Sequence, residues 1–358
     1  MQGQYGFKER LRPQSDFRPD YATKRGDEMK QSRTPSATVH TCPAARAYTR
    51  LPAFLQRSLL ALLLLFSLFF ASPVLAVDRL SPYLYEDTKR LVRLVEDAAT
   101  LMERNGTAAF AEFDRKDSRW FNQAYYFFVY DLSGVNVFHA ASPELTGKNL
   151  MDFSDMNGKP VLRFITDIGK KPQRDANGWV FYLWQEKNDF LPKWKSAYIR
   201  KVVAPDNRIY LLGCGVYNFK IERVIIQENI RQAAELLASE GKEAAFRAFR
   251  DPASRFNFLD TYVYVMDEKG RALVDPAFPK MQGRDLSNFR DAIGRPVMQE
   301  IIAKLQTHDE AWVQYLWPRP GAARLSRKLA YVRKVRIGEE TLFVGSDFFL
   351  ATPIWMRH

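Results

Sequence analysis

The stretch WVFYLWQEKNDFLPKWKSAYIRKV, residues 179–202, has a second version, WVQYLWPRPGAARLSRKLAYVRKV, at residues 312–335. The two segments align without a gap and share eleven of 24 positions, including Trp, Tyr, Lys and Arg residues. Each contains two runs rich in aromatic and β-branched residues, which predicts two strands and a connecting loop. A gapless repeat of this length indicates that one structural unit occurs twice in the chain.

The similarity continues on both sides of the opening stretch, with a shift near 135 residues. PELTGKNLMDFSDMNGKPV (residues 143–161) aligns with PKMQGRDLSNFRDAIGRPV (residues 279–297). LLGCGVY (residues 211–217) aligns with FVGSDFF (residues 343–349). Order and spacing are kept, so we expect two tandem modules. Their predicted bounds are residues 84–219 and 222–350.

Both copies show the same pattern of expected elements. Apolar residues recur at helical spacing in residues 86–104 and 224–239, and Gly106 and Gly241 follow these helices at C-cap positions. In the first copy a short helix, a hairpin, a loop, a second helix and three strands follow, at residues 107–113, 126–139, 147–160, 160–170, 179–185, 196–203 and 210–217. The predicted fold class is α+β, with a long N-terminal helix and a five-stranded antiparallel sheet in each module.

The charge of the chain gives no reason to expect a nucleic-acid partner. The net charge is +12, and residues 1–76 carry eleven basic and five acidic residues, or +6, which leaves 12 − 6 = +6 spread over the rest. We find neither a compact basic segment nor a nucleic-acid-binding motif. Catalytic motifs and metal-ligand spacings are also missing from the sequence, so we expect no enzyme activity, no cofactor and no metal.

An apolar run of thirteen residues, LLALLLLFSLFFA (residues 59–71), precedes SPVLA, which ends at Ala76. A membrane-spanning helix needs about 20 apolar residues, so the run is typical of a signal peptide. We expect a signal peptide over residues 53–76, cleaved after Ala76, and a periplasmic or otherwise extracytoplasmic protein. Residues 1–52 are expected to be a disordered extension or the result of a misassigned start, with Met29 as the alternative start. An uncleaved N-terminal membrane anchor is the alternative.

Several motifs together resemble one known family. They are the DLSG turn between the first two strands, GKNLMDFSDMNGKP, the aromatic strand from Gly178, the K-x-x-Y-x-R-K pattern from Lys195, and the final GCGVY. This combination is similar to the extracellular Cache fold, and in particular to its type-2 single, PAS-like sensor class. The resemblance covers both modules and implies that each holds a small ligand, often an organic acid, against its sheet.

The resemblance implies one ligand pocket in each module. In the first module it assigns Tyr126, His139, Trp179, Tyr182, Lys195, Tyr198 and Arg200. In the second module it assigns Tyr262, Asp275, Trp312, Tyr315, Lys328, Tyr331 and Arg333. Arginine can clasp a carboxylate through two parallel hydrogen bonds. The alternative is that the aromatic residues belong to the core and that the basic residues form a solvated strand face.

The two copies differ at one position of this set. The first has His139 where the second has Asp275. An acid at this position repels a carboxylate and pairs with an amine or with Arg333, so the two pockets need not bind the same ligand.

The sequence therefore predicts an exported protein that binds or senses a small carboxylate. It would signal through a separate membrane kinase or chemoreceptor, and its long helices are candidate surfaces for a homodimer. The alternative is a periplasmic dimerisation or scaffold module without a ligand.

Overall fold

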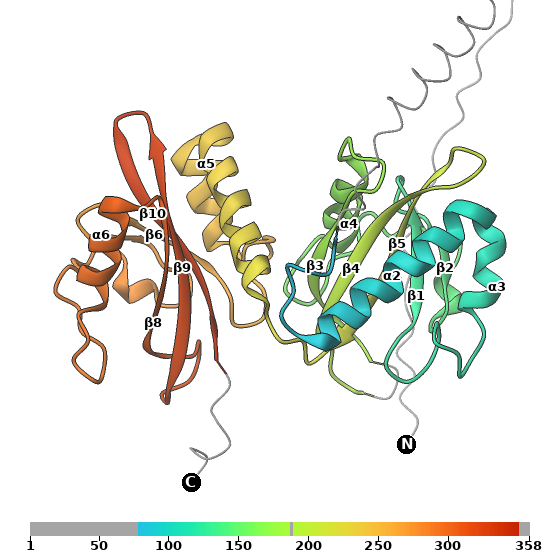
Figure 1. The fold of residues 1–358 in the computed structure, drawn as a ribbon, viewed down its shortest axis with the longest axis horizontal. Coiled ribbons are helices and arrows are strands. Elements are labelled where there is room, and N and C mark those ends of the chain that lie inside the picture. Colours follow the sequence, from blue (N-terminus) through green and yellow to red (C-terminus); the bar gives the residue numbers. More distant parts are fainter. Residues whose placement is uncertain (1–77, 187–188, 351–358) are drawn as a thin grey trace, which may run out of the picture. The chain divides into compact units, whose positions relative to one another are not determined.

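The computed structural model describes residues 78–186 and 189–350 (Figure 1). The predicted N-terminal extension and signal peptide lie outside these residues. No helix within the described ranges is both long enough and apolar enough to cross a bilayer. The bounds of the two modules, residues 84–219 and 222–350, remain a prediction.

The first module forms the predicted five-stranded antiparallel sheet, with strand order β2-β1-β5-β4-β3 (Figure 1). Its strands are β1 (Phe127–Asp131), β2 (Asn136–His139), β3 (Asn177–Trp184), β4 (Lys193–Val203) and β5 (Ile209–Tyr217). Its helices are α2 (Glu86–Asn105), α3 (Phe110–Phe113) and α4 (Val161–Lys170), with 3₁₀ turns at Gly106–Ala109 and Pro143–Leu145. The predicted helices and strands are thus present, with ends that shift by a few residues.

The second module repeats the sheet, with strand order β7-β6-β10-β9-β8. Its strands are β6 (Val263–Asp267), β7 (Ala272–Val274), β8 (Glu310–Pro318), β9 (Leu325–Ile337) and β10 (Glu340–Phe349). Its helices are α5 (Arg223–Arg250) and α6 (Val297–Thr307), with a 3₁₀ turn at Pro279–Met281. Gly241 has φ 78°, so the backbone leaves the helical conformation at the predicted C-cap before a second helical segment follows.

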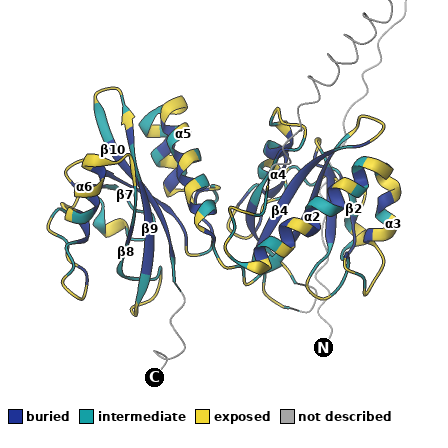
Figure 2. Cartoon of the chain, viewed as in Figure 1, coloured by how far each residue is buried: buried dark blue, intermediate teal, exposed yellow. Residues whose placement is uncertain are grey.

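Each sheet is covered on both faces, and its strands are largely buried (Figure 2). In the first module, Leu91 and Val95 of α2 pack with Phe127 in one cluster. Ile165 of α4 packs with Phe128 in a second cluster, on the opposite face. Burying a large apolar side chain stabilises the fold by roughly 1.5–3 kcal/mol, so both layers contribute to holding the sheet. Clusters around α5 and α6 repeat this arrangement in the second module.

The register of the sheets decides which side chains share a face. On β3 and β4, Trp179 pairs with Tyr198, and Tyr182 pairs with Lys195. Side chains alternate along a strand, so residues three positions apart point to opposite faces. The Trp179–Tyr198 pair therefore faces α2, and the Tyr182–Lys195 pair faces α4.

Candidate functional site

The seven residues predicted for the first pocket do not lie together. The face that packs against α4 carries Tyr126, His139, Tyr182 and Lys195. The face that packs against α2 carries Trp179, Tyr198 and Arg200. The prediction of one pocket that contains all seven is therefore wrong in its geometry, because it combined residues of opposite parity on two strands.

The residues on the α2 side contact that helix and the segment before it. Arg200 Nε donates to Glu96 Oε2 at 3.1 Å, and Arg200 Nη2 donates to Glu103 Oε1 at 3.3 Å. The Tyr198 hydroxyl donates to Glu96 Oε1 at 3.0 Å, and Trp179 Nε1 donates to the Tyr83 hydroxyl at 3.0 Å. The guanidinium that the sequence suggested for a ligand carboxylate thus holds carboxylates of the protein itself.

On the α4 side, a buried ammonium lies among aromatic rings. Lys195 is 1% exposed, and its Nζ donates to the Tyr126 hydroxyl at 2.6 Å. Four ring centroids lie 4.0–6.0 Å from Lys195 Nζ, those of Tyr126, Phe128, Tyr182 and Trp184. Ring faces attract cations, so this arrangement, which we call the Lys195 cage, stabilises a positive charge away from water.

His139 completes the wall of the Lys195 cage. Its ring stacks against Phe128 and Trp184, with centroids 6.0 and 6.2 Å away. His139 Nδ1 accepts a hydrogen bond from the Ser142 amide at 2.9 Å, so the neutral ring carries its proton on Nε2. Burial, reinforced by the nearby Lys195 charge, lowers the pKa of His139 to about 3. The histidine is therefore neutral at physiological pH and offers an N–H donor.

Within the described residues, no carboxylate lies within ion-pair distance of Lys195. Burial of the ammonium lowers the pKa of Lys195 to about 7. Gly215 occupies the neighbouring position on β5, and a Cβ there would meet Lys195 Cε at 2.8 Å. The Tyr217 hydroxyl, from the residue that pairs with Lys195 across the strands, is buried and has no hydrogen-bond partner among the described residues. The described residues thus leave the Tyr217 hydroxyl without a hydrogen bond and the Lys195 ammonium without a counter-ion.

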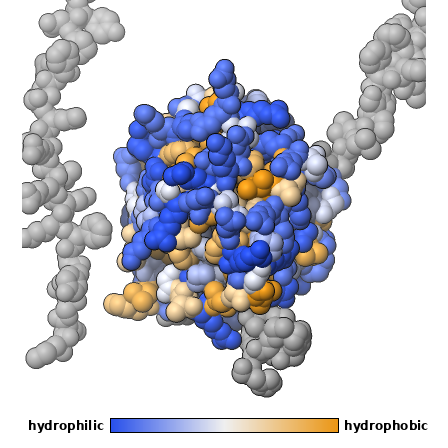
Figure 3. All heavy atoms as spheres, turned by 90° about the vertical axis from the view of Figure 1, so that its left-hand side faces the viewer, coloured by the Kyte–Doolittle hydropathy of each residue, from blue (hydrophilic) through white to orange (hydrophobic). Residues whose placement is uncertain are grey.

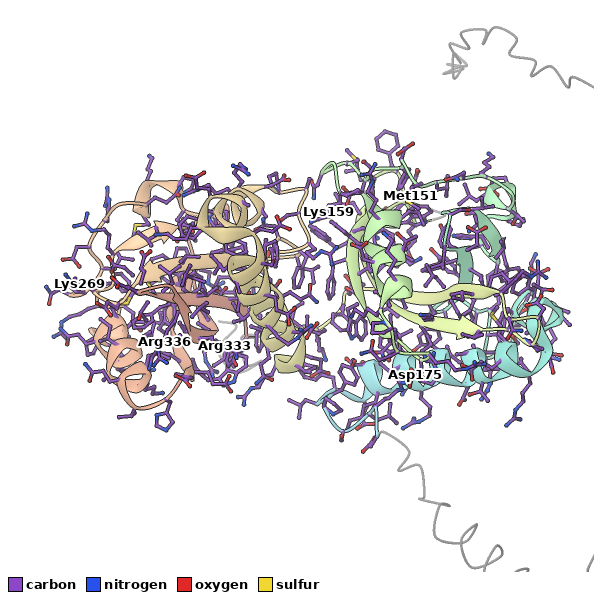
Figure 4. All side chains as sticks on the ribbon, turned by 90° about the horizontal axis from the view of Figure 1, so that it is seen from above. Met151, Lys159, Asp175, Lys269, Arg333 and Arg336 are labelled. Carbon is purple, nitrogen blue, oxygen red and sulfur yellow. The ribbon has the colours of Figure 1, made fainter. Side chains whose placement is uncertain are left out.

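The second module divides its seven predicted residues in the same way. The α6 side carries Tyr262, Asp275, Tyr315 and Lys328, all of which line one cavity. The α5 side carries Trp312, Tyr331 and Arg333. The Tyr331 hydroxyl donates to Glu310, and the Trp312 and Tyr331 rings lie 5.0 Å apart. Arg333, labelled in Figure 4, is two residues from Tyr331 on β9 and shares its face.

The lysine of the second module has a carboxylate partner, which no described residue supplies to Lys195. Lys328 Nζ lies 2.8 Å from Asp347 Oδ2, and the two side chains are 2% and 0% exposed. Lys328 Nζ also donates to the Tyr262 hydroxyl at 2.9 Å. Asp347 stands where the first module has Gly215, so the buried charge of Lys328 is compensated within the protein.

Sequence reasoning missed three groups of the two sites. Trp184 and Trp317 share parity with the predicted Tyr182 and Tyr315, so strict alternation along the strands identifies them. Asp347 aligns with Gly215 in the final strands of the two modules. An acid in this otherwise apolar strand, next to the strand that carries the lysine, indicates an ion pair with that lysine.

Comparisons with known proteins identify the family of both modules. Residues 115–246 match the family model described as Cache domain, and residues 216–348 match Single Cache domain 2. The methyl-accepting chemotaxis protein McpP of Pseudomonas putida is 31% identical over 129 residues, which cover 33% of this chain and 23% of that protein. The chain thus matches less than a quarter of the length of that relative.

Two solved structures are also similar. A periplasmic sensor domain of a chemotaxis protein is 27% identical, with a TM-score of 0.30 over 35% of this chain and 88% of that one. A methyl-accepting chemotaxis protein from Vibrio parahaemolyticus is 26% identical, with a TM-score of 0.30 over 37% and 88% of the two chains. From the family matches, the chain carries two Cache sensor domains in tandem, as the sequence motifs predicted.

Proposed function

We propose that the first module is a sensor for a small carboxylate, which binds to the ammonium of Lys195. The observation that carries this proposal is the buried Lys195, for which the described residues supply no carboxylate partner. An isolated ammonium costs several kcal/mol to bury, and a carboxylate beside it offsets that cost. The neutral His139 and the Tyr126 and Tyr217 hydroxyls add donors for the second carboxylate oxygen.

We also infer that the protein is exported and acts outside the cytoplasm. The proposal rests on the apolar run at residues 59–71 and on the Cache family of both modules, and it includes cleavage after Ala76. N-terminal sequencing of the secreted protein is expected to give Val77 as the first residue. Recovery of the intact N-terminus in the membrane fraction would instead support an anchor.

The similarity to McpP supports a proposal about the signalling partner. McpP is a methyl-accepting chemotaxis protein, so a membrane chemoreceptor or a membrane kinase is the class of partner that we propose for this chain. A homodimer through the exposed side of the long helices is the quaternary arrangement that we propose with it.

The carboxylate proposal is tested by thermal unfolding of the full chain with short carboxylates from acetate to succinate. A ligand at a hundredfold excess over its Kd stabilises the native state by about 2.7 kcal/mol. We expect Lys195→Met to lose this stabilisation, and Lys328→Met, the equivalent change in the second module, to keep it. If no carboxylate stabilises the protein, the scaffold alternative is favoured; if Lys195→Met still responds, the site is elsewhere.

A further inference from the structure

The second module contains a cavity of about 50 Å³ between its sheet and α6. A cavity needs about 10–15 Å³ to hold one water molecule, so this cavity has room for a group of a few heavy atoms. One wall is apolar and includes Met266, Val297, Met298 and Ile301. The side of this module that carries α6 shows a largely hydrophilic surface with scattered hydrophobic side chains (Figure 3). Val297, Met298 and Ile301 are at most 4% exposed, so this wall is enclosed.

The charges at the polar end of this cavity differ from those of the Lys195 cage. Lys328 lines the cavity, but its ammonium already has the Asp347 carboxylate 2.8 Å away. A second carboxylate, Asp275, also lines the cavity. Two carboxylates thus accompany one ammonium, so the polar end carries a net negative charge when all three groups are ionised.

Asp275 has no cation partner among the residues that the structure describes. Its Oδ1 accepts a hydrogen bond from the Phe278 amide at 2.9 Å, and no basic side chain of the described residues lies within ion-pair distance of it. Burial raises the pKa of Asp275, which shows that its ionised form lacks full compensation. A cation beside this carboxylate would supply the missing compensation.

Two further polar atoms on the cavity wall have no partner in the described structure. The Tyr264 hydroxyl and Trp317 Nε1 are both buried and unpaired, and Tyr264 is 8% exposed. The Tyr264 oxygen can accept a hydrogen bond, whereas Trp317 Nε1 can only donate one. The faces of these two rings already contact the ammonium of Lys328, whose Nζ lies 5.6 Å from the Tyr264 centroid and 5.7 Å from the Trp317 centroid, so it is the unpaired atoms that bear on a ligand. Buried polar groups in native proteins are normally paired, so these atoms indicate a polar ligand or water in the cavity.

We infer that the second module binds an organic ammonium ion, with its charged nitrogen at Asp275 and Tyr264 and a short apolar chain against α6. Asp347 neutralises Lys328, the residue of the second module that aligns with Lys195. This inference rests on the second module alone and does not depend on the carboxylate site. Ammonium groups of monoamines and of amino acids share the required chemistry, and an amino acid also offers an acceptor to Trp317 Nε1.

The test uses the full chain with Lys195→Met, which removes the proposed anion site, and measures binding by calorimetry. The probes are propylamine, alanine and propionate. We expect one or both ammonium compounds to bind, and Asp275→Asn to weaken this binding about tenfold or more because a charge pair is lost. Asp309→Asn, which removes an exposed carboxylate of the same module, is expected to have no effect. Tighter binding of alanine would identify amino acids as the ligand source, and tighter binding of propylamine would identify monoamines.

A second variant keeps the inference testable if Asp275→Asn does not fold. Asp347→Gly recreates the arrangement of the first module and is expected to weaken ammonium binding and to introduce propionate binding. If neither ammonium compound binds, or if Asp275→Asn and Asp347→Gly both leave that binding unchanged in folded protein, the inference is overturned. Propionate binding to the Lys195→Met chain that is lost on Lys328→Met would overturn it as well.

Discussion

Lys195 and Lys328 occupy equivalent strand positions, yet within the described part of the chain a carboxylate lies 2.8 Å from Lys328 and none lies within ion-pair distance of Lys195. The difference comes from one residue on the last strand, Gly215 in one module and Asp347 in the other. A buried ammonium without a counter-ion either loses its proton or acquires an anion. The pKa of Lys195, lowered to about 7 by burial, shows that the first option is close at neutral pH.

The lowered pKa predicts how the stability of the ligand-free protein depends on pH. Lysine has a pKa of 10.5 without burial, whereas that of Lys195 is about 7 in the folded chain. Between these values the unfolded chain binds more protons than the folded chain, so the free energy of unfolding rises with pH through this window. Below pH 7 both states are protonated, and the full cost of burying the ammonium remains. Urea unfolding from pH 7 to 10.5 is expected to show this rise, which Lys195→Met should reduce. An identical pH profile in the variant would contradict the burial argument.

The same proton controls the affinity for the ligand. As pH rises above about 7, the free protein loses the ammonium on Lys195, so the apparent Kd for a carboxylate should rise by about tenfold per pH unit. Titrations at pH 6.5, 7.5 and 8.5 measure this change. Asp347→Asn, a change in the second module, should leave the profile unchanged, and a pH-independent Kd would exclude the lysine as the anchor.

At the scale of elements, β4 divides its side chains between two roles. Lys195 faces α4 and the candidate pocket, whereas Tyr198 and Arg200 bind Glu96 on α2. The buried guanidinium, 6% exposed, joins two carboxylates of α2 to the sheet. The long helix is therefore held to the sheet by charge as well as by its apolar face.

Arg200→Met is expected to lower the free energy of unfolding by about 1–3 kcal/mol, because Glu96 and Glu103 lose their shared cation. Carboxylate binding should be unchanged, since Arg200 lies on the other face of the sheet. Urea unfolding and calorimetry of the same variant measure both properties. A large loss of binding with unchanged stability would return Arg200 to the ligand site.

The elements were predictable because the duplicated sequence shows each strand and helix twice. The Trp179–Tyr198 and Tyr182–Lys195 pairs could not be assigned to a pocket from their residue types, since aromatic and basic side chains serve both faces. Parity separates the two pairs, but only the packed helices show which face is covered by α2. The contrast between Gly215 and Asp347 became meaningful once both were placed beside a buried lysine.

At the scale of the molecule, the two modules share a fold but differ in the charge of their buried sites. Among the described residues no acid pairs with the Lys195 ammonium, whereas Asp347 pairs with Lys328 and a second acid, Asp275, lines the cavity. Duplication of the fold has therefore kept the aromatic walls and changed the charged groups. The two proposed sites together predict that the protein binds two kinds of small molecule.

We expect propionate and an ammonium compound to occupy the protein together. Saturation with one should leave the Kd of the other unchanged within about twofold, because the sites use different residues. Competition titrations measure this independence. Displacement of one ligand by the other would mean that both use a single site.

The central claim, that Lys195 anchors a carboxylate, is tested most directly by counting protons. Calorimetry of propionate binding at pH 8, in buffers of different ionisation enthalpy, gives the number of protons taken up. With a pKa of about 7, Lys195 is mostly neutral at this pH, so binding should take up most of one proton per ligand. Binding without proton uptake would contradict the account.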